Sequence, residues 1–164
     1  MPSSFALAAP DPGADRFSHS PIDPLDVLRD AVRALGLGSE EADRAAEDGG
    51  CAIDDLLVTV APVPQPPSPA TAPQPAGLPV MLTVVMPQRF AEMAPQDASA
   101  LLANAPGLLA GFDAAIGCLP EGEATLHRRI ALPDDDTGGQ ALAREMVASA
   151  RLASLVFATG VAGD

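Results

Sequence analysis

The sequence predicts an α+β domain in which a mostly antiparallel, twisted sheet is flanked by helices. Apolar residues recur at helical spacing in three segments, and shorter apolar runs bounded by turn residues lie between them. The strands come in groups between the helices instead of alternating with them, which favours an antiparallel sheet. We therefore expect the element order α-β-β-β-α-β-β-α.

The first helix is predicted to begin at Pro24. Asp23 is suited to cap its N-terminus, because a side-chain oxygen can accept from the free backbone N–H groups there, and proline fits the first helical position. Gly36 ends the helix. The acidic stretch from Ser39 to Gly50 reads as a loop with at most a short helical turn. One apolar stripe along the helix consists of Leu25, Leu28, Val32 and Leu35.

Three strands are predicted next, at residues 51–53, 56–61 and 78–86. Asp54 and Asp55 form the turn between the first two. The third strand is apolar on both faces, so we expect both faces to be covered. Its two faces are Val80, Leu82, Val84 and Met86 on one side and Met81, Thr83 and Val85 on the other.

A second helix is predicted with Asp97 as its N-cap, followed by strands at 114–119 and 123–132 around a turn containing Gly122. Pro106 lies inside the helical pattern. Proline removes one helical hydrogen bond and its ring clashes with the preceding turn, at a cost of about 3 kcal/mol. We therefore expect the helix to break near Ala105, with an interface formed by two half-helices.

The last helix is predicted to open with three aspartates at 134–136 and to end at Gly160. Carboxylates are favoured at a helix N-terminus by the helix dipole, so we interpret these aspartates as a helix start and not as a metal site. The buried face of this helix is expected to consist of Leu142, Met146, Ala150, Ala153 and Phe157.

The domain boundaries follow from composition. We expect a disordered N-terminal tail at residues 1–22, one domain at 23–158 and a C-terminal tail at 159–164. A proline-rich loop at 62–77 interrupts the domain, because proline cannot join a strand ladder. Aromatic residues are only 3% of the 164-residue chain, which leaves a thin core. A homodimer would bury more apolar surface and relieve this shortage.

The charge and the reactive residues exclude several function classes. A net charge of −13, with arginine as the only basic residue type, does not suit nucleic acid or an anionic membrane surface. Cys51 and Cys118 form neither a disulfide framework nor a zinc motif. His127 has no nucleophile at a recognised spacing. We expect no enzyme activity, no metal and no cofactor, and a cytoplasmic location without membrane insertion.

Several segments together resemble a known family. They are the LGL of 35–37, DGGCAIDDLLVTV at 48–60, LLANAPGLLAG at 101–111 and LHRRIAL at 126–132, followed by the closing amphipathic helix. In this order they resemble a class I type III secretion chaperone of the Tir chaperone type, from Pro24 to Ala158. The sequence departs from the family pattern in the length of its proline-rich segment and in Pro106-Gly107, which lies in the helix expected at the dimer interface.

The resemblance implies a small acidic homodimer in the bacterial cytoplasm, without ATPase activity. Such chaperones bind the N-terminal, non-globular region of a secreted effector protein and keep it soluble and competent for secretion. The residues expected to bind the effector are Leu25, Leu28, Val32, Val58, Val60, Leu82 and Val84. Those expected at the dimer interface are Leu101, Leu102, Leu108, Leu109 and Ile116. The alternative is a small ligand-binding or regulatory α+β module without catalysis.

Overall fold

The computed structural model describes residues 23–64, 77–133 and 135–161. They form an α+β fold with a five-stranded antiparallel sheet, which confirms the predicted fold class. The tail predicted at 1–22 and most of the proline-rich loop lie outside the described residues. The helices are α1 (Pro24–Ala34), α2 (Ser39–Asp48), α3 (Pro95–Phe112) and α4 (Gly138–Val161), with a short 3-10 helix η1 (Phe90–Glu92). The strands are β1 (Gly50–Ile53), β2 (Leu56–Pro62), β3 (Leu78–Arg89), β4 (Ala114–Cys118) and β5 (Glu123–Leu132).

The strand order in the sheet is β1-β2-β3-β5-β4, and every neighbouring pair is antiparallel. The long central pair runs from Leu78 opposite Leu132 to Val85 opposite Thr125. Asp54 and Asp55 both have positive φ, as a two-residue hairpin between β1 and β2 requires. The short strands β1 and β4 therefore form the two edges of the sheet.

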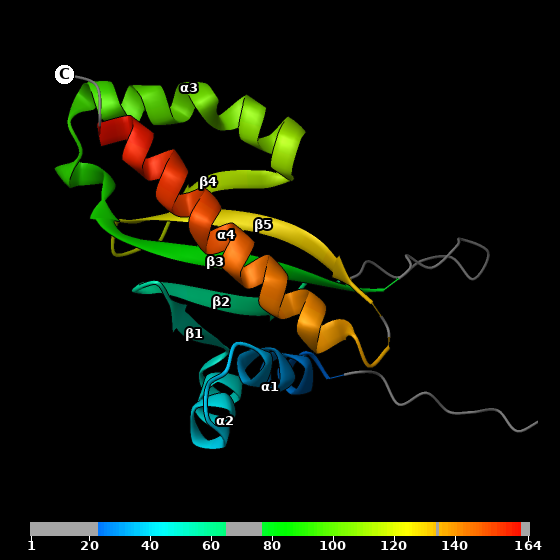
Figure 1. Ribbon diagram of the computed structural model, residues 1–164. Coiled ribbons are helices and arrows are strands. Elements are labelled where there is room, and N and C mark those ends of the chain that lie inside the picture. The colour runs from blue at the N-terminus through cyan, green and yellow to red at the C-terminus, as the bar shows by residue number, and fades with distance from the viewer. Residues whose placement is uncertain (1–22, 65–76, 134, 162–164) are drawn as a thin grey trace, which may run out of the picture.

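Helices α1 and α4 pack against each other and cover one face of the sheet, with α4 crossing it diagonally (Figure 1). Helix α3 lies along the β4 side and contacts both β4 and α4. The predicted buried face of α4 is confirmed, because all five of its residues are at most 2% exposed. The core beneath α4 includes Val58, Val60, Leu82, Val84 and Leu126.

The opposite face of the sheet, which we call the open face, is not covered by the described helices (Figure 1). Burial alternates along β2 and β3, so that every second side chain is buried and those between are half-buried or exposed. The prediction that both faces of β3 are covered is therefore wrong for the described part of this chain. The open face consists of Leu57, Thr59, Ala61, Met81, Thr83, Val85, Thr125, His127 and Arg129.

Helix α2 corrects the expectation of a loop after α1. Its three buried alanines, Ala42, Ala45 and Ala46, recur at helical spacing. The Glu41 carboxylate accepts from the backbone N–H of Gly38 at 3.0 Å and caps the helix start. The segment was difficult to predict because alanine marks a buried helix face much more weakly than leucine does.

Helix α3 passes through Pro106 without the expected break. Leu101 and Leu108 lie on either side of the proline and are both buried in the same core, which fixes both halves of the helix. Pro106 itself is exposed, so water can replace the missing N–H at the carbonyl of Leu102. The helix also begins earlier than predicted, with Ala94 as N-cap and Asp97 in its first turn.

Helix α4 begins at Gly138, later than predicted, so Asp135 and Asp136 precede the helix and do not form its first turn. The Asp135 carboxylate accepts from the hydroxyl of Thr137 at 2.5 Å and from its backbone N–H at 2.9 Å. These hydrogen bonds lower the pKa of Asp135. The helix continues past Gly160 to Val161, so it extends into the segment expected to be a C-terminal tail.

Candidate functional site

The structure places most of the residues predicted to bind an effector inside the core. Leu25 alone is exposed, at 44%. The other six, Leu28, Val32, Val58, Val60, Leu82 and Val84, are at most 8% exposed and lie between the sheet and its covering helices. The prediction named the strands that form the sheet but chose the face that the helices cover. Period-2 alternation defines two faces without saying which one the rest of the chain will cover.

The residues predicted at a dimer interface divide into two groups. Leu101 and Leu108 are buried within the single chain, and Ile116 is half-buried in β4. Leu102 and Leu109 are each 60% exposed on the outer side of α3. Because these two lie seven positions apart, they share one face of the helix.

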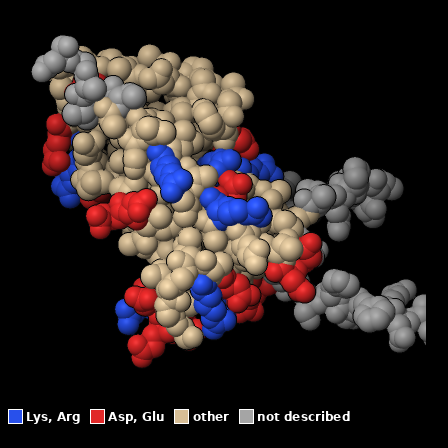
Figure 2. Space-filling view, viewed as in Figure 1, with Lys and Arg blue, Asp and Glu red and all other residues tan. Residues whose placement is uncertain are grey.

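Leu102 and Leu109 belong to a larger apolar area, which we call the α3 surface. Phe112 at the end of α3 is 51% exposed, and Leu155 of α4 is 66% exposed. No residue from Ala98 to Phe112 carries a charge. Figure 2 shows the consequence, since the part of the molecule formed by α3 is largely free of red and blue side chains on this face. Phe112 and Leu155 were not assigned to this surface from the sequence. The available signal was the helical spacing of Leu102, Leu109 and Phe112, which places these three on one side of α3.

A hydrogen-bonded group of side chains crosses the open face. The hydroxyl of Thr83 lies 2.9 Å from Nδ1 of His127, and the hydroxyl of Thr125 lies 2.9 Å from Nε2. In the neutral imidazole, one ring nitrogen donates to a hydroxyl and the other accepts from one. Partial burial lowers the pKa of His127. Nδ1 thereby links β5 to β3, while the bond at Nε2 lies within β5 and fixes the orientation of the ring.

The reactive side chains do not assemble into a reaction centre among the described residues. Cys51 is half-buried, and burial raises the pKa of its thiol, which makes it a weaker nucleophile near neutral pH. Cys118 is exposed on the edge strand β4. Within the described residues, no three His, Cys, Asp or Glu side chains come together where they could hold a metal ion. None of the helices in the described ranges is long and apolar enough to span a bilayer.

Comparison with known proteins returned no matching family model, no matching curated protein and no matching solved structure. A function can therefore be proposed only from the chemistry of the exposed surfaces. Among the described residues, the apolar α3 surface and the mixed apolar and polar open face are accessible. Both are suited to contact with protein.

Proposed function

We propose that this chain is a class I type III secretion chaperone that binds the N-terminal, non-globular region of an effector and keeps it soluble and secretion-competent. In this proposal it acts in the bacterial cytoplasm as a homodimer, by binding alone, without a cofactor or a catalysed reaction. The observation that carries the proposal is the exposed, uncharged α3 surface in a chain of net charge −13. The resemblance of the sequence to this family is its second support.

The α3 surface favours self-association. Two copies of an acidic chain repel each other wherever carboxylates face carboxylates, so the contact between them should be uncharged. The 98–112 segment provides such a contact. Gly107 and Gly111 lie four positions apart, and a Cβ added at either would meet nothing within 4 Å. At 3.6 residues per turn, however, these glycines lie on the opposite side of α3 from Leu102 and Leu109 and are not part of that contact.

The open face favours binding of an extended effector segment. Leu57 is 48% exposed, and Val85 opposite it and Met81, four positions away along β3, are half-buried. These side chains belong to the strands predicted to bind the effector, but lie on the accessible side. Ordering a disordered segment costs at least a few kcal/mol, so an effector would need a large apolar contact such as this face together with Leu25.

The first test is the oligomeric state. We expect light scattering of the full chain to give twice its mass of 16.6 kDa. The double variant Leu102→Glu/Leu109→Glu should give the monomer mass, because it places four carboxylates where two α3 surfaces meet. Leu25→Glu is the matched control, since Leu25 is similarly exposed but lies on α1, far from α3 (Figure 1). A monomeric native chain would contradict the homodimer.

The second test is binding of an effector. Secreted proteins encoded beside this chain in its source genome should be co-expressed with it, each with and without its N-terminal region. We expect one of them to become soluble and to co-purify only when that region is present. Leu57→Glu/Met81→Glu should abolish the effect while leaving the dimer intact. If no such protein gains solubility, the chaperone proposal is wrong.

A further inference from the structure

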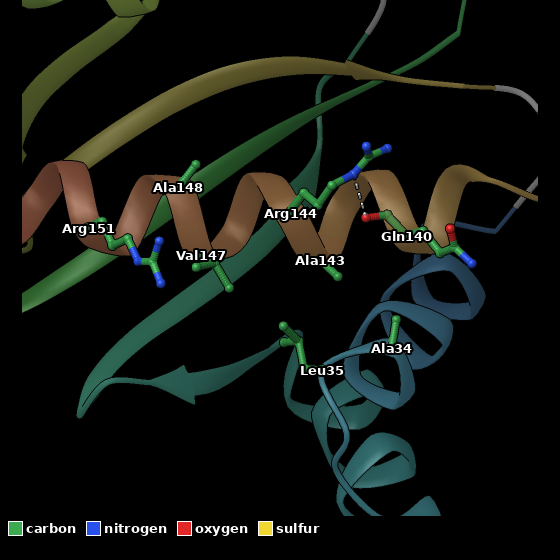
Figure 3. Close-up of a pocket in the computed structure, with 8 residues that line it drawn as sticks. All are labelled: Ala34, Leu35, Gln140, Ala143, Arg144, Val147, Ala148 and Arg151. Atoms are coloured by element: carbon green, nitrogen blue, oxygen red, sulfur yellow. Dashed lines mark hydrogen bonds between the residues drawn. The ribbon is translucent and has the colours of Figure 1, made fainter.

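A groove between α1 and α4 is a separate feature that the sequence did not indicate. It has a volume of about 650 Å³ and lies between the C-terminal end of α1 and the middle of α4. Figure 3 shows Leu35 and Ala34 on the α1 side, with Ala143 and Val147 of α4 directed toward them. These side chains give the groove an apolar floor.

The walls of this groove are fixed by close packing of the two helices. A Cβ added at Gly139 would lie 2.7 Å from Cβ of Asp30, so the first turn of α4 approaches α1 as closely as a glycine permits. Ala31 and Val32 of α1 are fully buried beside this contact. The two helices that form the groove are therefore as close at this point as their side chains permit.

Two arginines of α4, Arg144 and Arg151, line the groove, and no acidic residue does. Among the described residues neither arginine has a carboxylate partner, whereas Arg29, Arg33, Arg89 and Arg128 are all in ion pairs. Figure 2 shows basic side chains in the middle of this face, over α4, with an acidic side chain between them and the other acidic ones toward its margins. The groove therefore carries two positive charges without described carboxylate partners in a chain of net charge −13.

The spacing of the two arginines determines what they can bind together. They lie seven positions apart on α4, which separates them by about 10 Å along the helix axis. Figure 3 shows Arg151 extending toward the Leu35 side, whereas Arg144 extends away from Leu35 and Ala34 and its Nε donates to the backbone carbonyl of Gln140 at 3.4 Å, so Arg144 forms the outer rim of the groove. One small anion cannot bridge guanidinium groups at that separation. Two carboxylates on one peptide can, with apolar side chains between them on the groove floor.

We propose that the α1–α4 groove binds an acidic amphipathic segment of the partner protein, with two carboxylates one to two helical turns apart paired to Arg144 and Arg151. The mode is a short helix in a groove. This rests on the proposed function only in taking the segment to belong to the effector. It adds the chemistry that the effector must carry, namely carboxylates flanking leucine-like side chains.

The test uses the full chain and a defined probe. The probe is a fluorescein-labelled peptide of Leu and Ala with two Glu seven residues apart, and its control carries Lys at the same two positions. We expect fluorescence anisotropy to show saturable binding of the Glu peptide, at least about tenfold tighter than that of the Lys peptide. Binding should weaken as NaCl is raised, because salt screens charge pairs at the surface.

Charge reversal in the groove supplies the decisive comparison. Arg144→Glu/Arg151→Glu should weaken the Glu peptide about tenfold or more and strengthen the Lys peptide. The control Arg44→Glu/Arg89→Glu changes the net charge equally at two exposed arginines, on α2 and at the end of β3, that do not line the groove. It should leave binding of the Glu peptide within about twofold of the native chain.

Three results would overturn the inference. They are no saturable binding of the Glu peptide at millimolar concentration, equal loss in the control variant, and full competition by free glutarate, which would indicate a small-molecule site. None of them depends on the dimer or on the effector. Failure of the groove and failure of the chaperone proposal are therefore distinguishable.

Discussion

His127 shows how one side chain can connect two strands and also carry a pH response. Its imidazole spans the hydroxyls of Thr83 and Thr125, one on β3 and one on β5. Gly117 of β4 leaves the space that the ring occupies, because a Cβ there would lie 2.5 Å from Nε2 of His127. A glycine in this edge strand is therefore required by the packing of its neighbour.

The lowered pKa of His127 predicts a loss of stability in mild acid. In the unfolded chain a histidine has a pKa of about 6.5. Because the folded pKa is lower, the unfolded chain binds more protons in the interval between the two values. The free energy of unfolding should therefore be highest above about pH 6.5 and fall as the pH is lowered through the folded pKa.

Urea unfolding followed at several pH values between about 8 and 5 checks this expectation. His127→Gln should flatten the pH dependence of the free energy of unfolding in that range, since carboxylates titrate lower, at about pH 4. The only other histidine provides the control, and His19→Gln should retain the native slope. If His127→Gln keeps the whole slope, another group is responsible.

Helix α3 is stabilised by its packing more than by its own sequence. Only Leu101 and Leu108 of its 18 residues are buried, and it contains Pro106 in its fourth turn. The buried pair outweighs the local preference for a break. The resulting continuous helix displays Leu102, Leu109 and Phe112 on one side, which two half-helices at an angle would not do.

Replacing Pro106 should stabilise the chain. Pro106→Ala restores an N–H that can donate to the carbonyl of Leu102 and removes the ring from the helix interior. We expect the free energy of unfolding to rise by about 1–3 kcal/mol in urea titration at fixed protein concentration. Pro95→Ala is the matched control, because Pro95 occupies the first turn, where proline is well tolerated, and should bring no gain. A loss of stability in Pro106→Ala would show that the packing of α3 requires the proline.

The charge distribution predicts opposite responses to salt for the proposed dimer contact and the proposed groove site. Two copies of net charge −13 repel each other, and the contact proposed at the α3 surface is uncharged. Raising NaCl shortens the Debye length from about 10 Å at 0.1 M to about 3 Å at 1 M. Sedimentation at these two concentrations should show tighter dimers at high salt, whereas binding at the α1–α4 groove should become weaker. Dimers that dissociate as salt increases would instead indicate ion pairs across the interface.

Elements with strong local signals could be predicted from residues near one another in sequence. Asp23 caps α1 as predicted, because its side chain accepts from the N–H of Leu25, only two positions away, at 3.0 Å. Strand β5 runs from Glu123 to Leu132 as expected, and Gly122 adopts the positive φ of the turn before it. In each case the decisive interaction lies within a few residues.

Which faces of these elements remain exposed depends on contacts between segments that are distant in the sequence. Period-2 alternation separated Leu82 from Met81, but only the packing of α1 and α4 decided which of the two is buried. The unbroken α3 depends on a core to which all the other long elements contribute. The groove with Arg144 and Arg151 exists because Gly139 lets α4 approach Asp30 of α1, over a hundred positions earlier in the chain. Local preference sets where helices and strands form, and long-range burial of apolar area sets which of their faces remain available for a partner.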